Sequence, residues 1–169
     1  ILGTAIRHGE AKNVASLLAA YPKSGPDVQL DISGALANTK DAAVAKHILD
    51  SALAPGGFVR PQDLRRWTPL FIRNHYTREV ICDKMLTEWQ WFESIFTASK
   101  SFDYLPTYCA GVITTKAWEK RYHEFFEPLE SNKILAKNIA IGYADIASRV
   151  AWRNRDEPQI IDWLKTTLG

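Results

Sequence analysis

Apolar residues recur at helical spacing along almost the whole chain. The clearest stripe keeps one face for about four turns, starts just after residues 131–132, and consists of Leu135, Ile139, Tyr143, Ile146 and Val150. No segment alternates polar and apolar residues between hairpin turns, which is the pattern of a half-buried strand. The sequence therefore predicts an all-α protein.

Two further stripes begin behind residues of the types that cap helices. The first follows Asp41 and consists of Val44, Ala45, Ile48, Leu49 and Ala52. The second follows Thr77 and consists of Ile81, Met85, Trp89, Phe92 and Phe96. Both predict helices with one apolar face.

Helix-breaking residues divide the chain at fairly even intervals. They lie at residues 21–26, 54–57, 99–101, 127–128 and 156–158. Pro61 and Pro158 suit the first turn of the helix that follows, where a missing N–H costs nothing. We expect roughly eight to ten helices of about 10 to 20 residues, joined as antiparallel pairs. Such pairs fit a closed bundle or a stack of helical hairpins.

Length and composition limit the class of protein. A chain of 169 residues has room for one domain, and 46% hydrophobic with 24% charged residues is a globular composition. We therefore expect residues 1–169 to form a single helical domain. The longest uncharged stretch, residues 104–115, is too short to cross a membrane. The net charge of +2, with the two signs interspersed, is not typical of a nucleic-acid-binding protein.

Known catalytic and metal-binding patterns are missing from the sequence. The four histidines lie far apart, and His123-Glu124 has no second His four positions on, so no H-E-x-x-H zinc helix is present. There is no G-x-S-x-G turn and no phosphate-binding glycine loop. Cys82 and Cys109 are interpreted as buried free thiols in a reducing compartment. The sequence predicts no catalytic and no metal-binding residue.

Aromatic residues are concentrated between Trp67 and Phe126. Trp89, Trp91 and Phe92 cannot all face the same way on one helix. One interpretation is a helix buried on two sides, and the alternative is a groove for a peptide or ligand.

Several short motifs, taken in order, point to a known family. They are residues 58–64 (FVRPQDL), 71–78 (FIRNHYTR), 89–91 (WQW), 99–102 (SKSF), 149–158 (RVAWRNRDEP) and 161–164 (IDWL). Their order and spacing resemble the C-terminal helical domain of M1-family zinc aminopeptidases, the aminopeptidase N group. The closest likeness is to bacterial cytoplasmic enzymes related to the endoplasmic-reticulum aminopeptidases. The resemblance implies stacked antiparallel helix pairs in a HEAT- or armadillo-like α-superhelix.

The resemblance also implies that catalysis takes place in another domain of a longer polypeptide. The zinc-binding H-E-x-x-H and the G-x-M-E-N motif belong to an upstream catalytic domain, so this chain alone is expected to be inactive and to hold no zinc. Its expected partners are that upstream domain and peptide substrates, and its expected location is the cytoplasm. It would form the wall or lid of the substrate cavity and help to select peptides. Arg73 and Arg78 are the candidates to meet a peptide carboxylate, and helix-end or interhelix ion pairs are the alternative.

The start of the chain carries one more expectation. The single Met is Met85, and the opening residues are already apolar and helix-like, so we expect the later part of a longer C-terminal domain. Its first helix pair would then expose an apolar face, which predicts self-association through residues 1–20. The alternative function is a free-standing α-solenoid adaptor that binds a protein or peptide.

Overall fold

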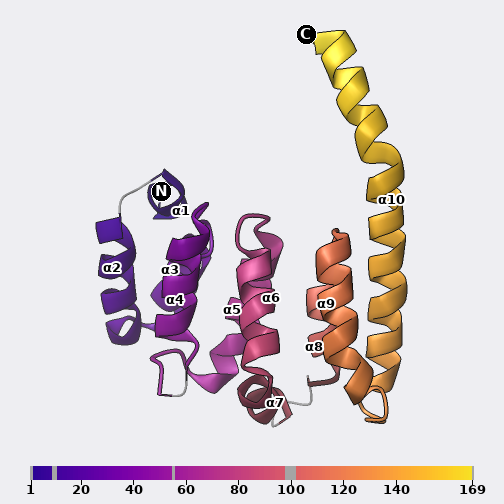
Figure 1. Ribbon diagram of the computed structural model, residues 1–169. Coiled ribbons are helices and arrows are strands. Elements are labelled where there is room, and N and C mark those ends of the chain that lie inside the picture. The colour runs from indigo at the N-terminus through magenta and orange to yellow at the C-terminus, as the bar shows by residue number, and fades with distance from the viewer. Residues whose placement is uncertain (1, 9–10, 55, 98–101, 169) are drawn as a thin grey trace. The chain divides into compact units, whose positions relative to one another are not determined.

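The computed structural model describes residues 2–8, 11–54, 56–97 and 102–168. Over these residues the chain forms ten α-helices and three short 3-10 helices, and no strand (Figure 1). The all-α prediction is confirmed. The chain divides into two compact units, Ile1–Lys100 and Ser101–Gly169, which we describe separately. The predicted break at residues 99–101 lies outside the described residues.

The first unit is built in two layers of helices. Helix α3 contacts α1 and α5, whereas α4 contacts α2 and α6, and α5 also contacts α6. This order of contacts fits the predicted pairing of successive helices. The elements are α1 (Leu2–His8), α2 (Ala11–Ala20), η1 (Tyr21–Lys23), α3 (Pro26–Leu36), α4 (Ala42–Ala52), α5 (Pro61–Arg73), α6 (Arg78–Thr87) and α7 (Trp89–Thr97).

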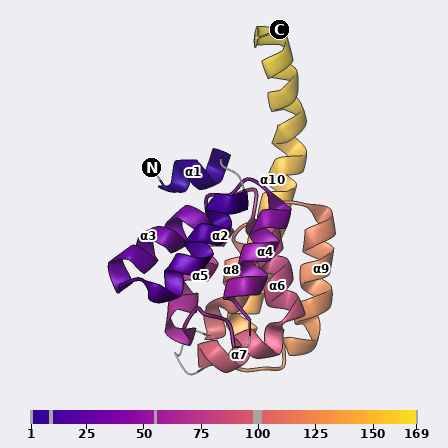
Figure 2. The same ribbon diagram turned by 90° about the vertical axis from the view of Figure 1, so that its left-hand side faces the viewer.

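The second unit is organised around one long helix. This helix, α10, contacts both α8 and α9, and its last part continues beyond them (Figures 1 and 2). Leu135, in the turn directly before α10, and Ile139, Ile146 and Val150 within the helix are fully buried, as the apolar stripe predicted, while Tyr143 is half-buried. The elements are η2 (Phe102–Tyr104), α8 (Leu105–Ala110), α9 (Lys116–Phe126), η3 (Glu127–Leu129) and α10 (Ala136–Leu168).

Local sequence signals explain several helix starts. The Asp41 carboxylate accepts hydrogen bonds from the N–H groups of Ala43 and Val44, at 2.7 and 3.1 Å, and so caps α4 as predicted. Helix α5 begins at Pro61, whose fixed φ suits a first turn. The Thr115 hydroxyl accepts from the Trp118 N–H and caps α9.

Two sequence predictions about helix boundaries are wrong. The stripe behind Thr77 is divided between α6 and α7, because the helix is interrupted at Glu88, although all five of its apolar residues are buried. Pro158 does not start a new helix but lies inside α10. Pro158 has no N–H to donate to the carbonyl of Asn154, four residues earlier. Because Asn154 is exposed, water can bind that carbonyl instead and the helix can continue.

Close packing in each unit depends on particular residues. In the first, the Trp67 indole N–H donates to the Tyr21 hydroxyl at 3.2 Å, and both side chains are buried. In the second, a Cβ on Gly142 would lie 2.2 Å from the Tyr122 hydroxyl, so only glycine lets α10 approach α9 here. The two cysteines are buried and free, as predicted. No helix in the described part of the chain has both the length and the apolar character needed to cross a membrane.

Candidate functional site

The turn between α5 and α6 carries the two arginines predicted to meet a peptide. Arg73 is the last residue of α5 and is exposed, and Arg78 is the first residue of α6 and is half-buried. Within residues 2–8, 11–54, 56–97 and 102–168, neither guanidinium group forms an ion pair or a hydrogen bond. The ion pairs of the alternative prediction are therefore not found in this part of the chain.

A single asparagine fixes this turn to the neighbouring one. The Asn74 amide donates to the carbonyls of Ala37 and Thr39, at 2.8 and 2.7 Å, and its side-chain oxygen accepts from the Tyr76 N–H at 3.1 Å. The buried Thr77 hydroxyl also donates to the Phe71 carbonyl at 2.8 Å. The turn is thereby tied to the loop between α3 and α4 as well as to its own helix.

We call the two hydrogen bonds that Asn74 donates to Ala37 and Thr39 the clamp. A third cation, Lys40, lies close to the turn that the clamp holds. The Lys40 ammonium lies 6.0 Å from the centre of the Tyr76 ring, a cation–π distance, and the His75 ring lies 3.8 Å from the same ring. Lys40, His75 and Tyr76 are all exposed. We call Lys40, Arg73, His75, Tyr76 and Arg78 the cationic turn. It offers positive charge and an aromatic surface at one end of the α5–α6 pair.

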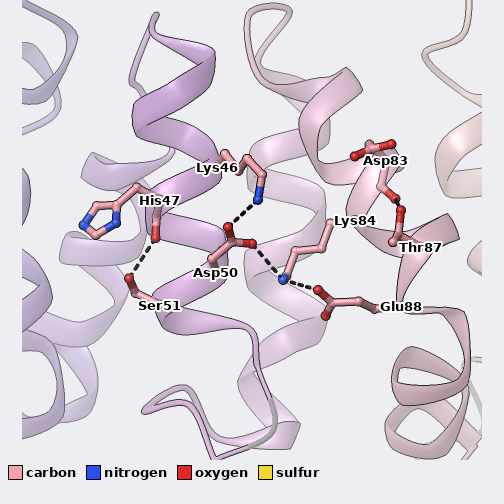
Figure 3. Close-up of polar contacts among 8 residues, drawn as sticks. All are labelled: Lys46, His47, Asp50, Ser51, Asp83, Lys84, Thr87 and Glu88. Carbon is pink, nitrogen blue, oxygen red and sulfur yellow. Dashed lines mark hydrogen bonds and ion pairs between the residues drawn. The ribbon is translucent and has the colours of Figure 1, made fainter.

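A second group of charged residues lies between α4 and α6 (Figure 3). Asp50 on α4 bonds to Lys46 on its own helix, at 2.5 Å, and to Lys84 on α6, at 3.1 Å. Lys84 also bonds to Glu88 at 2.7 Å. The Lys84 side chain is only 7% exposed, so its ammonium is buried but paired with two carboxylates.

Hydrogen bonding within this group sets the protonation of Asp50. Burial alone would raise the pKa of the Asp50 carboxyl group, but the bonds from Lys46 and Lys84 lower it below its ordinary value. The same bond to Asp50 raises the pKa of Lys46. Asp50 and Lys46 are therefore both charged at neutral pH.

The hollow beside these residues is too small to be a binding pocket. Its volume of about 80 Å³ is far below the several hundred Å³ of a typical ligand site. The Thr87 hydroxyl, which lines the hollow, donates to the Asp83 carbonyl of its own helix (Figure 3). Ser51 donates in the same way to the His47 carbonyl, away from the hollow. The hollow is lined by Lys46, Leu49, Asp50, Val80, Asp83, Lys84, Thr87 and Glu88. We interpret the network as a structural link between α4 and α6.

The second unit holds its own cluster of ionisable rings. The His123 ring stacks on Tyr143 at 3.9 Å, with the planes 5° apart, and Tyr122 meets Tyr143 edge-on. Burial, together with the negative charge of Glu130, raises the pKa of Tyr143. His123 therefore acts as a packing residue. Among the residues that the structure describes, no group of three or more His, Cys, Asp or Glu side chains could hold a metal ion.

Comparison with known proteins places the chain in a family. Residues 1–148 match the model of the ERAP1-like C-terminal domain. The chain belongs to this family. The resemblance to the C-terminal domain of M1 aminopeptidases is thus confirmed, and the cationic turn lies within the matched part of the ERAP1-like domain.

Similar curated proteins are bacterial aminopeptidases. Aminopeptidase N of Lactobacillus helveticus is 30% identical over 143 residues, which are 84% of this chain and 17% of that protein. Aminopeptidase N of Lactococcus lactis subsp. lactis is 31% identical over 107 residues, or 63% of this chain and 13% of that protein. The chain thus spans less than a fifth of the length of these relatives.

Sequence reasoning named Arg73 and Arg78 but missed the residues that organise their surroundings. Asn74 belongs to the motif of residues 71–78, and a polar residue directly after a helix indicates a turn. The carbonyl groups that its amide binds, however, lie 35 and 37 residues away in the sequence. Lys84 stands next to Met85 of an apolar stripe and is i,i+4 to Glu88, a spacing that favours an ion pair on a helix. Its bond to Asp50 required the packing of α4 on α6.

Proposed function

We propose that this chain is a non-catalytic C-terminal domain of a zinc-dependent M1 aminopeptidase, an enzyme that removes N-terminal residues from peptides. The match of residues 1–148 to the ERAP1-like C-terminal domain is the observation that carries this proposal. The relatives named aminopeptidase N support it. The zinc and the catalytic residues belong to the upstream catalytic domain of the same polypeptide, which acts in the cytoplasm.

The domain contributes a wall or lid to the substrate cavity. A helical stack of the HEAT or armadillo type presents an extended concave surface, and such a surface can confine a peptide next to a catalytic centre. Confinement raises the effective concentration of the peptide and selects substrates by their length. The domain thereby helps to choose which peptides are cut.

Within this wall, Arg73 and Arg78 bind the carboxylate at the far end of the peptide. Both are held near the turn that Asn74 clamps, and neither pairs with a carboxylate among the described residues. A guanidinium group binds a carboxylate through paired charge-assisted hydrogen bonds. The Lys40 ammonium, which lies over the Tyr76 ring of the same turn, adds positive charge to it.

The proposal is tested in the full-length polypeptide that carries this domain. Two substrates of identical sequence are compared, one with a free C-terminal carboxylate and one with a C-terminal amide. The expected result is that the unaltered enzyme prefers the carboxylate in kcat/KM by about tenfold, which corresponds to one charge-assisted interaction. The double variant Arg73→Ala, Arg78→Ala is expected to lose this preference.

Two controls separate this effect from a general loss of activity. Turnover of a small aminoacyl fluorophore, which is too short to reach the turn, is expected to remain unchanged in the double variant. Arg65→Ala removes an exposed arginine from the same helix α5 and is expected to retain the preference for the carboxylate. An unchanged preference in the double variant would contradict the role of Arg73 and Arg78.

A further inference from the structure

The last part of α10 presents an apolar face that nothing in its own unit covers. We call residues 160–168 the C-terminal segment. Its large apolar side chains are all substantially exposed: Ile160 48%, Ile161 44%, Trp163 59%, Leu164 41% and Leu168 76%. Large apolar side chains exposed to this extent, and so close together, are unusual on a free surface.

Helical geometry places these five side chains on one side. At 3.6 residues per turn they occupy an arc of roughly 160°, which also holds Thr167. The polar residues Gln159, Asp162, Lys165 and Thr166 fall on the opposite side. The face points in the same direction as the buried stripe of Ile139, Ile146 and Val150 earlier in α10. One side of α10 therefore carries two apolar stretches, of which α8 and α9 cover only the first (Figure 2). Arg153, Asp156 and Glu157 lie between the two stretches on the same side.

A charged boundary separates the covered and uncovered halves. The Arg153 guanidinium donates to both carboxylate oxygens of Glu157, at 2.8 and 3.0 Å, and to the Thr114 hydroxyl at 3.1 Å. Beyond this point every residue of α10 from Glu157 to Leu168 is exposed. The segment thus continues as an amphipathic helix without its own partner.

We propose that the C-terminal segment pairs antiparallel with the same segment of a second copy of the chain, with Leu164 near the two-fold axis. In this arrangement Ile160 of one copy lies opposite Leu168 of the other, and the two Leu164 side chains meet, so apolar residues meet at both ends and at the centre of the segment. The segment carries Asp162 and Lys165 and is electrically neutral, so like charges do not oppose the pairing.

The available area suits such a pair. The five apolar side chains of one segment expose on the order of 600 Å², so two copies could bury at most about 1,200 Å², the lower limit of specific interfaces. The dimer is therefore expected to be weak and dependent on concentration. The competing location, residues 1–20, offers less: within residues 2–8 and 12–20, Leu2 is the one large apolar side chain that is clearly exposed, at 44%.

Sedimentation velocity of the 169-residue chain over a wide concentration range tests this proposal. The unaltered chain is expected to show a monomer–dimer equilibrium. Leu164→Glu would place two like charges at the axis and is expected to raise the dissociation constant at least about tenfold. The matched control Ile141→Glu changes a residue of α10 with the same 41% exposure, outside the segment, and is expected to leave the dissociation constant unchanged.

A cross-linking experiment supports or overturns the same geometry without a disruptive charge. Under mild oxidation, Leu164→Cys is expected to form a disulfide that joins two copies of the chain, whereas Ile141→Cys is not. The native Cys82 and Cys109 are buried. A strictly monomeric chain at the highest concentration would overturn the proposal, as would a dimer weakened by Leu2→Glu but not by Leu164→Glu.

Discussion

Helix α6 carries two cations in contrasting settings. Lys84, in the body of the helix, is buried and bonded to Asp50 and Glu88. Arg78, at its first residue, has no ion pair among the described residues, and neither does Arg73 across the turn. A cation whose charge is neutralised inside the fold stabilises structure, whereas a cation held in place without a partner can bind an anion. These cations therefore divide into a structural set, Lys84, and a proposed binding set, Arg73 and Arg78.

Removal of Lys84 is expected to have the largest effect on stability. Lys84→Ala would leave Asp50 and Glu88 without their shared ammonium and is expected to lower the free energy of unfolding by about 2 kcal/mol. Lys46→Ala removes a lysine that also bonds to Asp50 but is 67% exposed, so it should lower the free energy of unfolding clearly less than Lys84→Ala does. Urea unfolding of both variants measures the difference. Equal values would contradict a structural role for Lys84.

Loss of the clamp is expected to have the next largest effect. Asn74→Ala removes the two donated bonds to the loop between α3 and α4 and is expected to cost about 1.5 kcal/mol. Asn74→Asp keeps an acceptor for the Tyr76 N–H but cannot donate, so its cost should be similar. If thermal unfolding showed Asn74→Asp to be as stable as the unaltered chain, the donated bonds would not hold the turn.

The pH dependence of stability sharpens the comparison further. The pKa of Asp50 is lower in the folded chain than its ordinary value, so the charged carboxylate stabilises the fold. This contribution to the free energy of unfolding is fully present above the unfolded pKa, near 4, and is lost as the pH falls through the pKa of the folded chain. Asp50 is 44% exposed, and the contribution is therefore expected to stay below about 1 kcal/mol. The stability difference between the unaltered chain and Asp50→Asn, measured by urea unfolding from neutral to acidic pH, should shrink below about pH 4. A constant difference would show that these bonds do not stabilise the charged carboxylate.

The smallest change in stability is expected for the arginines of the turn. Arg73→Ala and Arg78→Ala break no ion pair among the described residues, and each should alter the free energy of unfolding by less than about 0.5 kcal/mol. Urea unfolding provides the measurement. A loss as large as that of Lys84→Ala would place these arginines in the structural set instead.

The sequence predicted the fold class better than it predicted the boundaries. Helical spacing identified the buried stripe of α10 and the cap at Asp41, because both depend on residues close together in the chain. The end of α10 was predicted wrongly, because Pro158 is tolerated where the surrounding backbone is open to water. The interruption at Glu88 was missed because the apolar spacing continues across it.

The candidate site was predictable only in part. Arg73 and Arg78 were named from the family resemblance, which supplied their position next to a turn. The clamp at Asn74 and the bond between Lys84 and Asp50 join helices that are more than 30 residues apart, and no local pattern reports such contacts. Gly142 was likewise inconspicuous, since its importance comes from the Tyr122 hydroxyl that lies against it.

The most direct test of the central claim is a paired measurement of zinc content and aminopeptidase turnover. The 169-residue chain is assayed alone and together with the separately expressed upstream region of its polypeptide. The account predicts no bound zinc and no turnover for the chain alone, and altered turnover of peptides when the upstream region is present. Stoichiometric zinc or turnover by the chain itself would contradict the account, because a catalytic site would then lie within these 169 residues.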